Sequence, residues 1–190
     1  MRLFYCCELP EATQRELDKI AQQFRALHAR VSWVRPENFH ITLKFLGEVA
    51  PTALDALKVL GEQVAASAQG FELIFDTVGA FPSVQRPRVL WIGTSQIPQE
   101  ILALHERLEG ELSKMGFAPE GRFTPHVTVG RVKDERPPEH LAQIFSRIGS
   151  FAHRVQITHL TLMESRLAPS GAIYTPVATW DLSISKSLQK

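Results

Sequence analysis

PENFHITL, at residues 36–43, is echoed by TPHVTV at residues 124–129, and these two stretches decide how the rest of the chain is interpreted. Each places a histidine two positions before a threonine, inside a run of β-branched and apolar residues that favours a strand. Side chains on a strand alternate between its faces, so His40 and Thr42 point the same way, as do His126 and Thr128. Two such strands would line one pocket with two imidazoles and two hydroxyls.

The composition is that of an ordinary globular protein. Of 190 residues, 44% are apolar and 22% are charged, which is enough to bury a sizeable core. The formal net charge of +1 argues against a protein that holds long nucleic acid by bulk electrostatics, but it leaves room for a small phosphate ligand or an RNA end. No apolar run is long enough to cross a bilayer and no leader-like segment opens the chain, so we expect a cytoplasmic protein without membrane contact.

The two cysteines, Cys6 and Cys7, are adjacent in a predicted strand and would face opposite sides of it. They are poorly placed to form a disulfide with each other, and they are too few for a disulfide framework. We therefore expect two buried thiols.

Strand and helix patterns alternate along the chain. The predicted strands are residues 2–9, 39–46, 71–78, 88–93, 126–132, 152–165 and 172–182, and the predicted helices begin at Pro10, Pro51, Pro98 and Glu139 and end near residues 27, 69, 116 and 148. The order of strand, helix, motif strand and helix in the first half is loosely repeated in the second. This pattern predicts an α+β fold with two lobes related by a pseudo-twofold axis, in which two antiparallel sheets flanked by helices surround a central cleft.

A third His-x-Thr sequence at residues 159–161 has to be weighed against the other two. The first two copies follow a proline within a few residues and lead into Gly47 and Gly130, whereas the third has no such context. We therefore interpret His159 as a structural residue.

The wider sequence around both motifs resembles the 2H phosphoesterases. The first signature is RPENFHITLKFLGE at residues 35–48 and the second is PHVTVGR at residues 125–131. Within that superfamily the chain looks most similar to the bacterial and archaeal RNA 2′,3′-cyclic phosphodiesterases, once called 2′-5′ RNA ligases. Residues 2–9, 88–91 and 164–167 and Tyr174 also fit that family's layout, so the resemblance covers nearly all of residues 1–190 as one domain built of two lobes.

The resemblance implies a cofactor-independent and metal-independent enzyme that opens a 2′,3′-cyclic phosphate to a 2′-phosphate, with weak reversible 2′-5′ joining of RNA ends in some members. It implies that His40 is the proton donor to the 3′ oxygen and His126 the proton acceptor that activates water, although the residues alone leave the two roles interchangeable. Thr42 and Thr128 would bind the phosphate oxygens, and Arg131 is the family's phosphate-binding arginine by position. The expected partner is RNA with a cyclic phosphate end, or a cyclic nucleotide, acted on by a monomer.

Strict alternation places Arg131 on the face opposite to His126, unless a bulge at Gly130 redirects it. Lys44 shares the face of His40, where it would line the cleft or be solvated. We expect Phe39, Leu43 and Phe45 to be core residues, and Phe123, Trp33 or Phe45 to offer a stacking surface for a base. The remaining histidines are expected at the surface: His28, His105, His140 and His153.

Two other functions stay open. In a metal enzyme His40 and His126 would be ligands, but neither motif has the neighbouring Asp, Glu or Cys typical of such a site. In a non-catalytic module that binds RNA ends or nucleotides, a matched acid and base would not be needed. Turnover of a cyclic phosphodiester in the presence of a chelator distinguishes the three.

Overall fold

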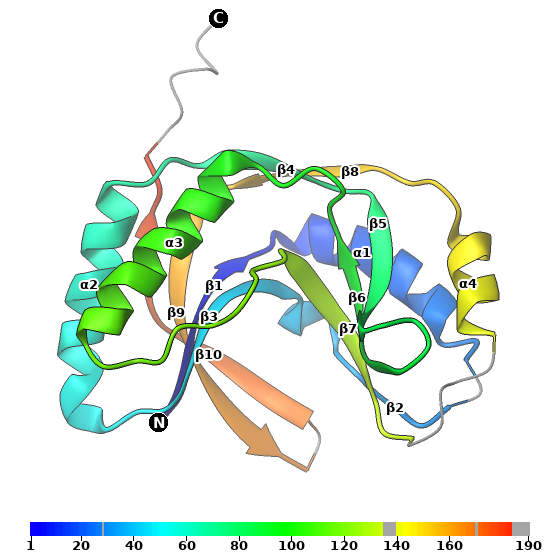
Figure 1. Ribbon diagram of the computed structural model, residues 1–190, viewed down its shortest axis with the longest axis horizontal. Helices are drawn as coiled ribbons and strands as arrows, with labels where there is room; N and C mark the ends of the chain where they lie inside the picture. Colours follow the sequence, from blue (N-terminus) through cyan, green and yellow to red (C-terminus); the bar gives the residue numbers. More distant parts are fainter. Residues whose placement is uncertain (28, 135–139, 170, 184–190) are drawn as a thin grey trace, which may run out of the picture.

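The computed structural model describes residues 1–27, 29–134, 140–169 and 171–183, whose strands form a large and a small antiparallel sheet (Figure 1). The strands are β1 (Arg2–Glu8), β2 (Val31–Trp33), β3 (His40–Glu48), β4 (Phe71–Phe75), β5 (Thr77–Pro82), β6 (Pro87–Gly93), β7 (His126–Val132), β8 (His153–Ile157), β9 (His159–Ala168) and β10 (Gly171–Asp181). The helices are α1 (Glu11–Phe24), α2 (Leu54–Ala66), α3 (Gln99–Lys114) and α4 (Leu141–Ile148), with short 3₁₀ turns at Pro36–Asn38 and Pro51–Ala53. The expected start of the last helix at Glu139 lies outside the described residues.

The two motif strands meet at the centre of the large sheet. Its strand order is β10-β9-β1-β3-β7-β6-β5, with β2 also paired to β7. β3 and β7 are paired at Ile41 and Val127, the residues that stand between histidine and threonine in each motif. The two groups of strands spread apart from this junction (Figure 1). The predicted α+β fold with two antiparallel sheets is confirmed, and the motif strands are neighbours within one of the sheets.

Two segments that each looked like one strand are in fact two. Residues 71–78 divide at Asp76 into β4 and β5, and residues 152–165 divide at Thr158 into β8 and β9. β4 pairs with β8 in the small sheet, whereas β5 and β9 belong to the large one. An apolar pattern reports burial on both sides of such a break, so it does not reveal where a chain leaves one sheet for another.

The helices are exchanged between the halves. α1 follows the first strand of the first half and packs both against the 3₁₀ turn at Pro36–Asn38 of its own half and against α4 and β8 of the second half. Phe24 of α1 meets Phe145 of α4 edge to face, with ring centroids 5.5 Å apart. In the other direction, α3 of the second half packs against α2 and β3 of the first. Each half therefore covers part of the other's core.

The interior is apolar, with few polar groups. Tyr5 is fully buried and its hydroxyl donates to the Leu57 carbonyl at 2.6 Å. Cys6 and Cys7 are buried free thiols, as expected, and burial raises the pKa of Cys7 to about 12. None of the helices in the described part of the chain is both long and apolar enough to span a membrane.

Candidate active site

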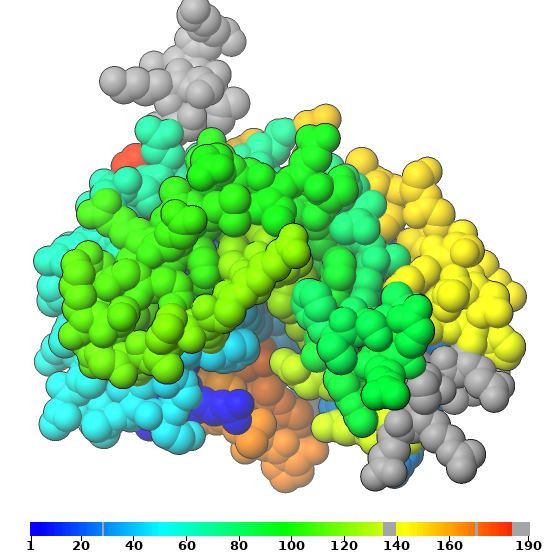
Figure 2. Space-filling model, in the orientation of Figure 1, coloured from blue at the N-terminus to red at the C-terminus, as the bar shows by residue number. Residues whose placement is uncertain are grey.

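Both motif histidines line one small cavity at the junction of β3 and β7. Its volume is about 120 Å³, and its lining residues are Val34, Asn38, His40, Thr42, Phe45, Phe81, Val89, His126, Thr128, Arg131 and Tyr174. All five residues predicted for the site, His40, Thr42, His126, Thr128 and Arg131, are among them. On the side of the molecule shown in Figure 2, the surface is hollowed between the cyan segment that contains β3 and the green β5–β6 hairpin.

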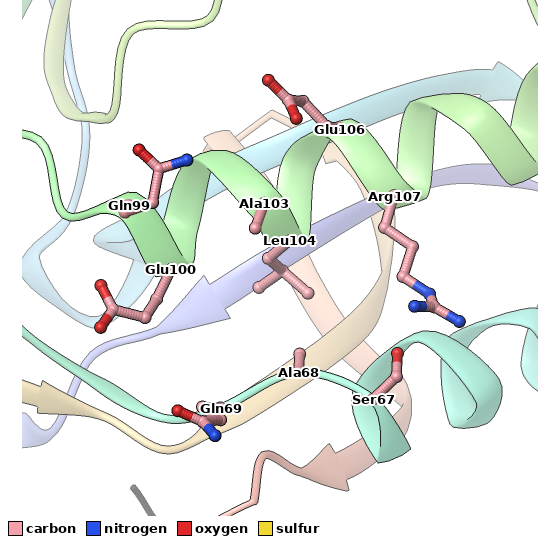
Figure 3. Close-up of a pocket in the computed structure, with 9 residues that line it drawn as sticks. All are labelled: Ser67, Ala68, Gln69, Gln99, Glu100, Ala103, Leu104, Glu106 and Arg107. Atoms are coloured by element: carbon pink, nitrogen blue, oxygen red, sulfur yellow. The ribbon is translucent and has the colours of Figure 1, made fainter. Parts of the chain in front are cut away.

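A larger cavity, of about 620 Å³, lies elsewhere, between the end of α2 and the first turns of α3 (Figure 3). Its lining includes Glu100, Glu106 and Arg107, but no histidine or cysteine. Size therefore favours this cavity, while the paired titratable groups favour the smaller one. We place the candidate active site at the histidines because acid–base chemistry needs groups that can exchange protons.

The two imidazoles are held in the same way. Nδ1 of His40 lies 2.7 Å from the Asn38 carbonyl oxygen, and Nδ1 of His126 lies 2.7 Å from the Thr124 carbonyl oxygen. A carbonyl only accepts, so each Nδ1 carries a proton and each Nε2 is left to exchange one. Nε2 of His40 is 3.1 Å from the Thr42 hydroxyl oxygen. The backbone carbonyl two residues earlier thus fixes the tautomer in both halves.

Aromatic rings support both imidazoles. Phe4 and Tyr174 pack on His40, with ring centroids 4.9 and 5.1 Å away. Phe81 packs edge to face on His126 at 5.0 Å. The motifs gave no signal for Phe81, because it comes from β5, far away in the sequence. These rings orient the imidazoles and exclude water from their faces.

A bulge in each motif strand determines which later residues face the cleft. In β3, Tyr5 and Cys6 of β1 pair with Lys44 and Thr42, so Leu43 is an extra residue. In β7, Leu90 and Trp91 of β6 pair with Gly130 and Thr128, so Val129 is extra. An extra residue reverses the alternation beyond it.

The bulge in β7 brings Arg131 to the face of His126 and Thr128, where it lines the cavity. The predicted redirection is therefore present, one residue before the expected Gly130. A side chain at Gly130 would have no room, because a Cβ there would be 2.9 Å from the Trp33 ring. Trp33 packs over this glycine and is not among the residues that line the cavity.

The bulge in β3 corrects two expectations. Lys44 neither lines the cleft nor is solvated: it is 1% exposed, with Nζ 2.7 Å from Glu109 Oε1 and donating to the Ala118 carbonyl at 2.7 Å. Phe45, expected in the core, is 49% exposed and lines the cleft at the position that Arg131 occupies in β7. Phe39 and Leu43 are buried, as predicted.

The other histidines lie away from the cleft. His105, expected at the surface, is buried, with Nδ1 3.0 Å from the Leu43 carbonyl oxygen and its ring stacked on Phe123 at 4.1 Å, which also removes Phe123 as a surface for a base. His153 is half-buried, with Nε2 3.0 Å from the Thr13 hydroxyl oxygen, whereas His140 is exposed as expected. His159 is exposed and its Nε2 is 2.9 Å from Asp181. His28 lies outside the described residues.

Burial sets the protonation of both site histidines. It lowers the pKa of His40 from 6.5 to about 4, with the charges of His126 and Arg131 adding to the shift and the bond to the Asn38 carbonyl opposing it. Burial also lowers the pKa of His126, again with Arg131 adding to the shift. Both imidazoles are therefore neutral near pH 7 when the cleft holds no anion. Among the described residues, no three His, Cys, Asp or Glu side chains gather to form a metal site.

Comparison with known proteins gives consistent matches along the chain. The model of the LigT-like phosphoesterase family matches twice, at residues 8–91 and 92–174. A Methanothermobacter thermautotrophicus protein named RNA 2′,3′-cyclic phosphodiesterase is 32% identical over 96% of this chain and 99% of its own length. The crystal structure of Escherichia coli LigT complexed with 3′-AMP is 30% identical, with a TM-score of 0.75, and the match covers 95% of this chain and 97% of that one. A Thermus thermophilus crystal structure is 26% identical, with a TM-score of 0.81 and coverage of 96% and 98%.

Proposed function

Because the chain belongs to the LigT-like phosphoesterase family, we propose that it hydrolyses 2′,3′-cyclic phosphate ends of RNA to 2′-phosphates by paired-histidine catalysis. The observation that carries this proposal is the pair of imidazoles in one cavity, each with Nδ1 bound to a carbonyl and Nε2 left for proton exchange. Full-length relatives named RNA 2′,3′-cyclic phosphodiesterase support the substrate class. We also propose that the protein acts as a monomer in the cytoplasm, whose reducing conditions suit the two buried thiols.

The proposed step moves two protons in opposite directions. Water attacks phosphorus as His126 Nε2 takes its proton, the bond from phosphorus to the 3′ oxygen breaks, and His40 Nε2 gives a proton to that oxygen. The products are a 2′-phosphate and a free 3′ hydroxyl. A 5′ hydroxyl of RNA in place of water would give a 2′-5′ bond, so the same step would allow weak, reversible ligation. Thr42, Thr128 and Arg131 bind the phosphate oxygens as negative charge builds up on them.

One assay tests the reaction and its alternatives. RNA with a 2′,3′-cyclic phosphate end is incubated with the protein in EDTA, and the product is compared with 2′- and 3′-phosphate standards by phosphorus NMR. We expect turnover to a 2′-phosphate with EDTA present. Loss of activity on chelation, restored by zinc or manganese, would favour a metal enzyme. Binding of the RNA end without turnover would favour the non-catalytic module.

The pH dependence of the rate follows from the lowered histidine pKa values. The reaction needs one histidine protonated and one neutral, so the profile is bell-shaped, and kcat/KM reports the pKa values of the free enzyme. Both free values lie below 6.5. We therefore expect kcat/KM to be highest below pH 6.5 and to fall as pH rises through 7. A bound phosphate anion raises the histidine pKa values, so the optimum for kcat should lie at higher pH. A kcat/KM that keeps rising to pH 8 would contradict this mechanism.

Removal of the arginine should slow the reaction without changing which bond breaks. Arg131→Ala loses a charged fork at the phosphate, and loss of one such donor typically lowers the rate by about 10²-fold or more. Arg131→Lys should recover only part of the rate, because an ammonium keeps the charge but cannot donate two parallel hydrogen bonds to the phosphate as a guanidinium does. Chromatography of the product should still show a 2′-phosphate for both variants. A predominant 3′-phosphate, in the wild type or a variant, would reverse the sides assigned to His40 and His126.

A further inference from the structure

A second cavity adjoins the histidine cavity and has no part in the proposed proton transfers. Its volume is about 410 Å³, within the range for small-molecule sites. It shares Phe45, Arg131 and Tyr174 with the histidine cavity and is otherwise lined by Arg2, Phe4, Ser165, Leu167 and Ala172. We call it the side cavity. A group bound in it lies directly beside a phosphate held between the histidines.

The lining of the side cavity combines flat aromatic groups with positive charge. Phe45 is 49% exposed, and its ring centroid is 5.6 Å from that of the buried Phe4. Tyr174 meets Phe4 edge to face at 5.3 Å. Such rings offer surfaces on which a nucleobase can stack whatever its sequence. Of the three stacking candidates in the sequence, only Phe45 borders these cavities.

Arg2 supplies a positive charge in addition to that of Arg131. It is exposed, and within the described residues its guanidinium makes no ion pair or side-chain hydrogen bond. Its cross-strand neighbour Glu48 is paired instead with the amino group of Met1, at 3.4 Å. Both Arg2 and Arg131 act on the Tyr174 phenol, where their charges oppose the increase in pKa that burial causes. The side cavity therefore lies between two arginines, one of which is already assigned to the reacting phosphate.

This arrangement suits a nucleotide inside an RNA chain better than a free cyclic nucleotide. The terminal nucleoside of such an RNA has two phosphates, the cyclic phosphate at one end and the phosphodiester on its 5′ side at the other. A free nucleoside 2′,3′-cyclic phosphate has only the first and would leave Arg2 without a ligand. A guanidinium is the side chain best suited to a phosphodiester.

With the terminal nucleoside in the side cavity beside Phe45 and Tyr174, we propose that Arg2 binds the phosphodiester on its 5′ side. This inference rests on the proposed function and narrows its substrate class to RNA ends of two or more nucleotides. Arg2 is then a specificity residue that touches substrate but not the reacting atoms.

A thermodynamic cycle tests the contact. Two dinucleotides with a 2′,3′-cyclic phosphate end are compared, one with an ordinary phosphodiester between the nucleosides and one with a neutral methylphosphonate there. Each is offered to the wild type, Arg2→Ala and Arg166→Ala. Arg166 is a matched control because it lies on β9 between Ser165 and Leu167, which line the side cavity, while Arg166 itself pairs with Glu164 at 3.1 Å and does not line the cavity. Only a direct contact makes the two changes non-additive.

We expect the wild type and Arg166→Ala to have a kcat/KM about tenfold higher for the phosphodiester, the order expected for one hydrogen bond to a charged group. Arg2→Ala should show nearly equal values for the two. Equal values in the wild type, or a tenfold preference kept by Arg2→Ala, would overturn the assignment of Arg2 while leaving the proposed function intact. Failure of the wild type to turn over either dinucleotide would overturn the proposed function itself.

Discussion

Replacing either His40 or His126 by alanine is expected to lower kcat by about 10²–10⁴-fold, because each removes one of two proton transfers that occur in the same step. The double variant should be little slower than either single one, since residues that act as a unit do not contribute additively. Binding of a 2′-phosphate product should weaken much less than kcat falls, because Thr42, Thr128 and Arg131 still line the cavity. Single-turnover rates and product titration measure both quantities.

The third His-x-Thr sequence provides the control. His159 is exposed and pairs with Asp181 at the far end of β9, so His159→Ala should leave kcat within about twofold and stability within about 0.5 kcal/mol. Thermal melts of all variants show whether a rate loss reflects unfolding. A rate collapse in His159→Ala with normal turnover in His126→Ala would mean that the wrong pair of motifs has been chosen.

Lys44→Ala is expected to destabilise the protein by about 3–5 kcal/mol, the usual cost of removing one partner of a buried ion pair. The ammonium is almost inaccessible and lies 2.7 Å from Glu109 Oε1, so the variant leaves a largely buried carboxylate without its partner. It also removes the bond to the Ala118 carbonyl, in the segment that leads from α3 to His126. We therefore expect lower activity as well as a lower midpoint in urea unfolding.

Two further variants separate the buried charge from packing. Lys44→Met combined with Glu109→Leu should recover much of the stability, because it removes both charges and keeps apolar volume. Lys19→Ala breaks an exposed pair with Glu16 at 2.6 Å and should cost less than about 1 kcal/mol. A loss in Lys44→Ala as small as that in Lys19→Ala would show that the buried pair contributes little.

The sequence predicted the parts of the site that are local in the chain. A His-x-Thr sequence on a strand aims both side chains one way whatever the tertiary structure, so His40, Thr42, His126 and Thr128 were expected together and line one cavity. Most element types followed in the same way from periodicity, but the short strand β2 was not predicted. The roles of donor and acceptor came from family resemblance and remain predictions.

The misjudged residues depend on partners distant in the sequence. A bulge is defined by the register between two strands, so neither the burial of Lys44 nor the exposure of Phe45 could be obtained from β3 alone. His105 looked like a surface residue because its carbonyl partner and its stacked ring lie on other elements. The breaks at Asp76 and Thr158, where the chain passes from the small sheet to the large one, could not be predicted for the same reason. Each break is defined by the strands that pair with the segments before and after it.

The exchange of α1 and α3 between the halves bears on how such a fold could arise. A chain made of one half would expose part of the apolar face of its own helix, since α4 and β8 help to cover α1, and α3 lies on α2 and β3. Buried groups such as Phe24 and His105 would then meet water. A chain of one half would cover these groups only by pairing with a second copy that supplies the missing helix. Joining two such copies in one chain would keep these contacts between the halves. The equivalent positions Phe45 and Arg131 would then be free to differ, so that one side of the cleft is aromatic and the other cationic.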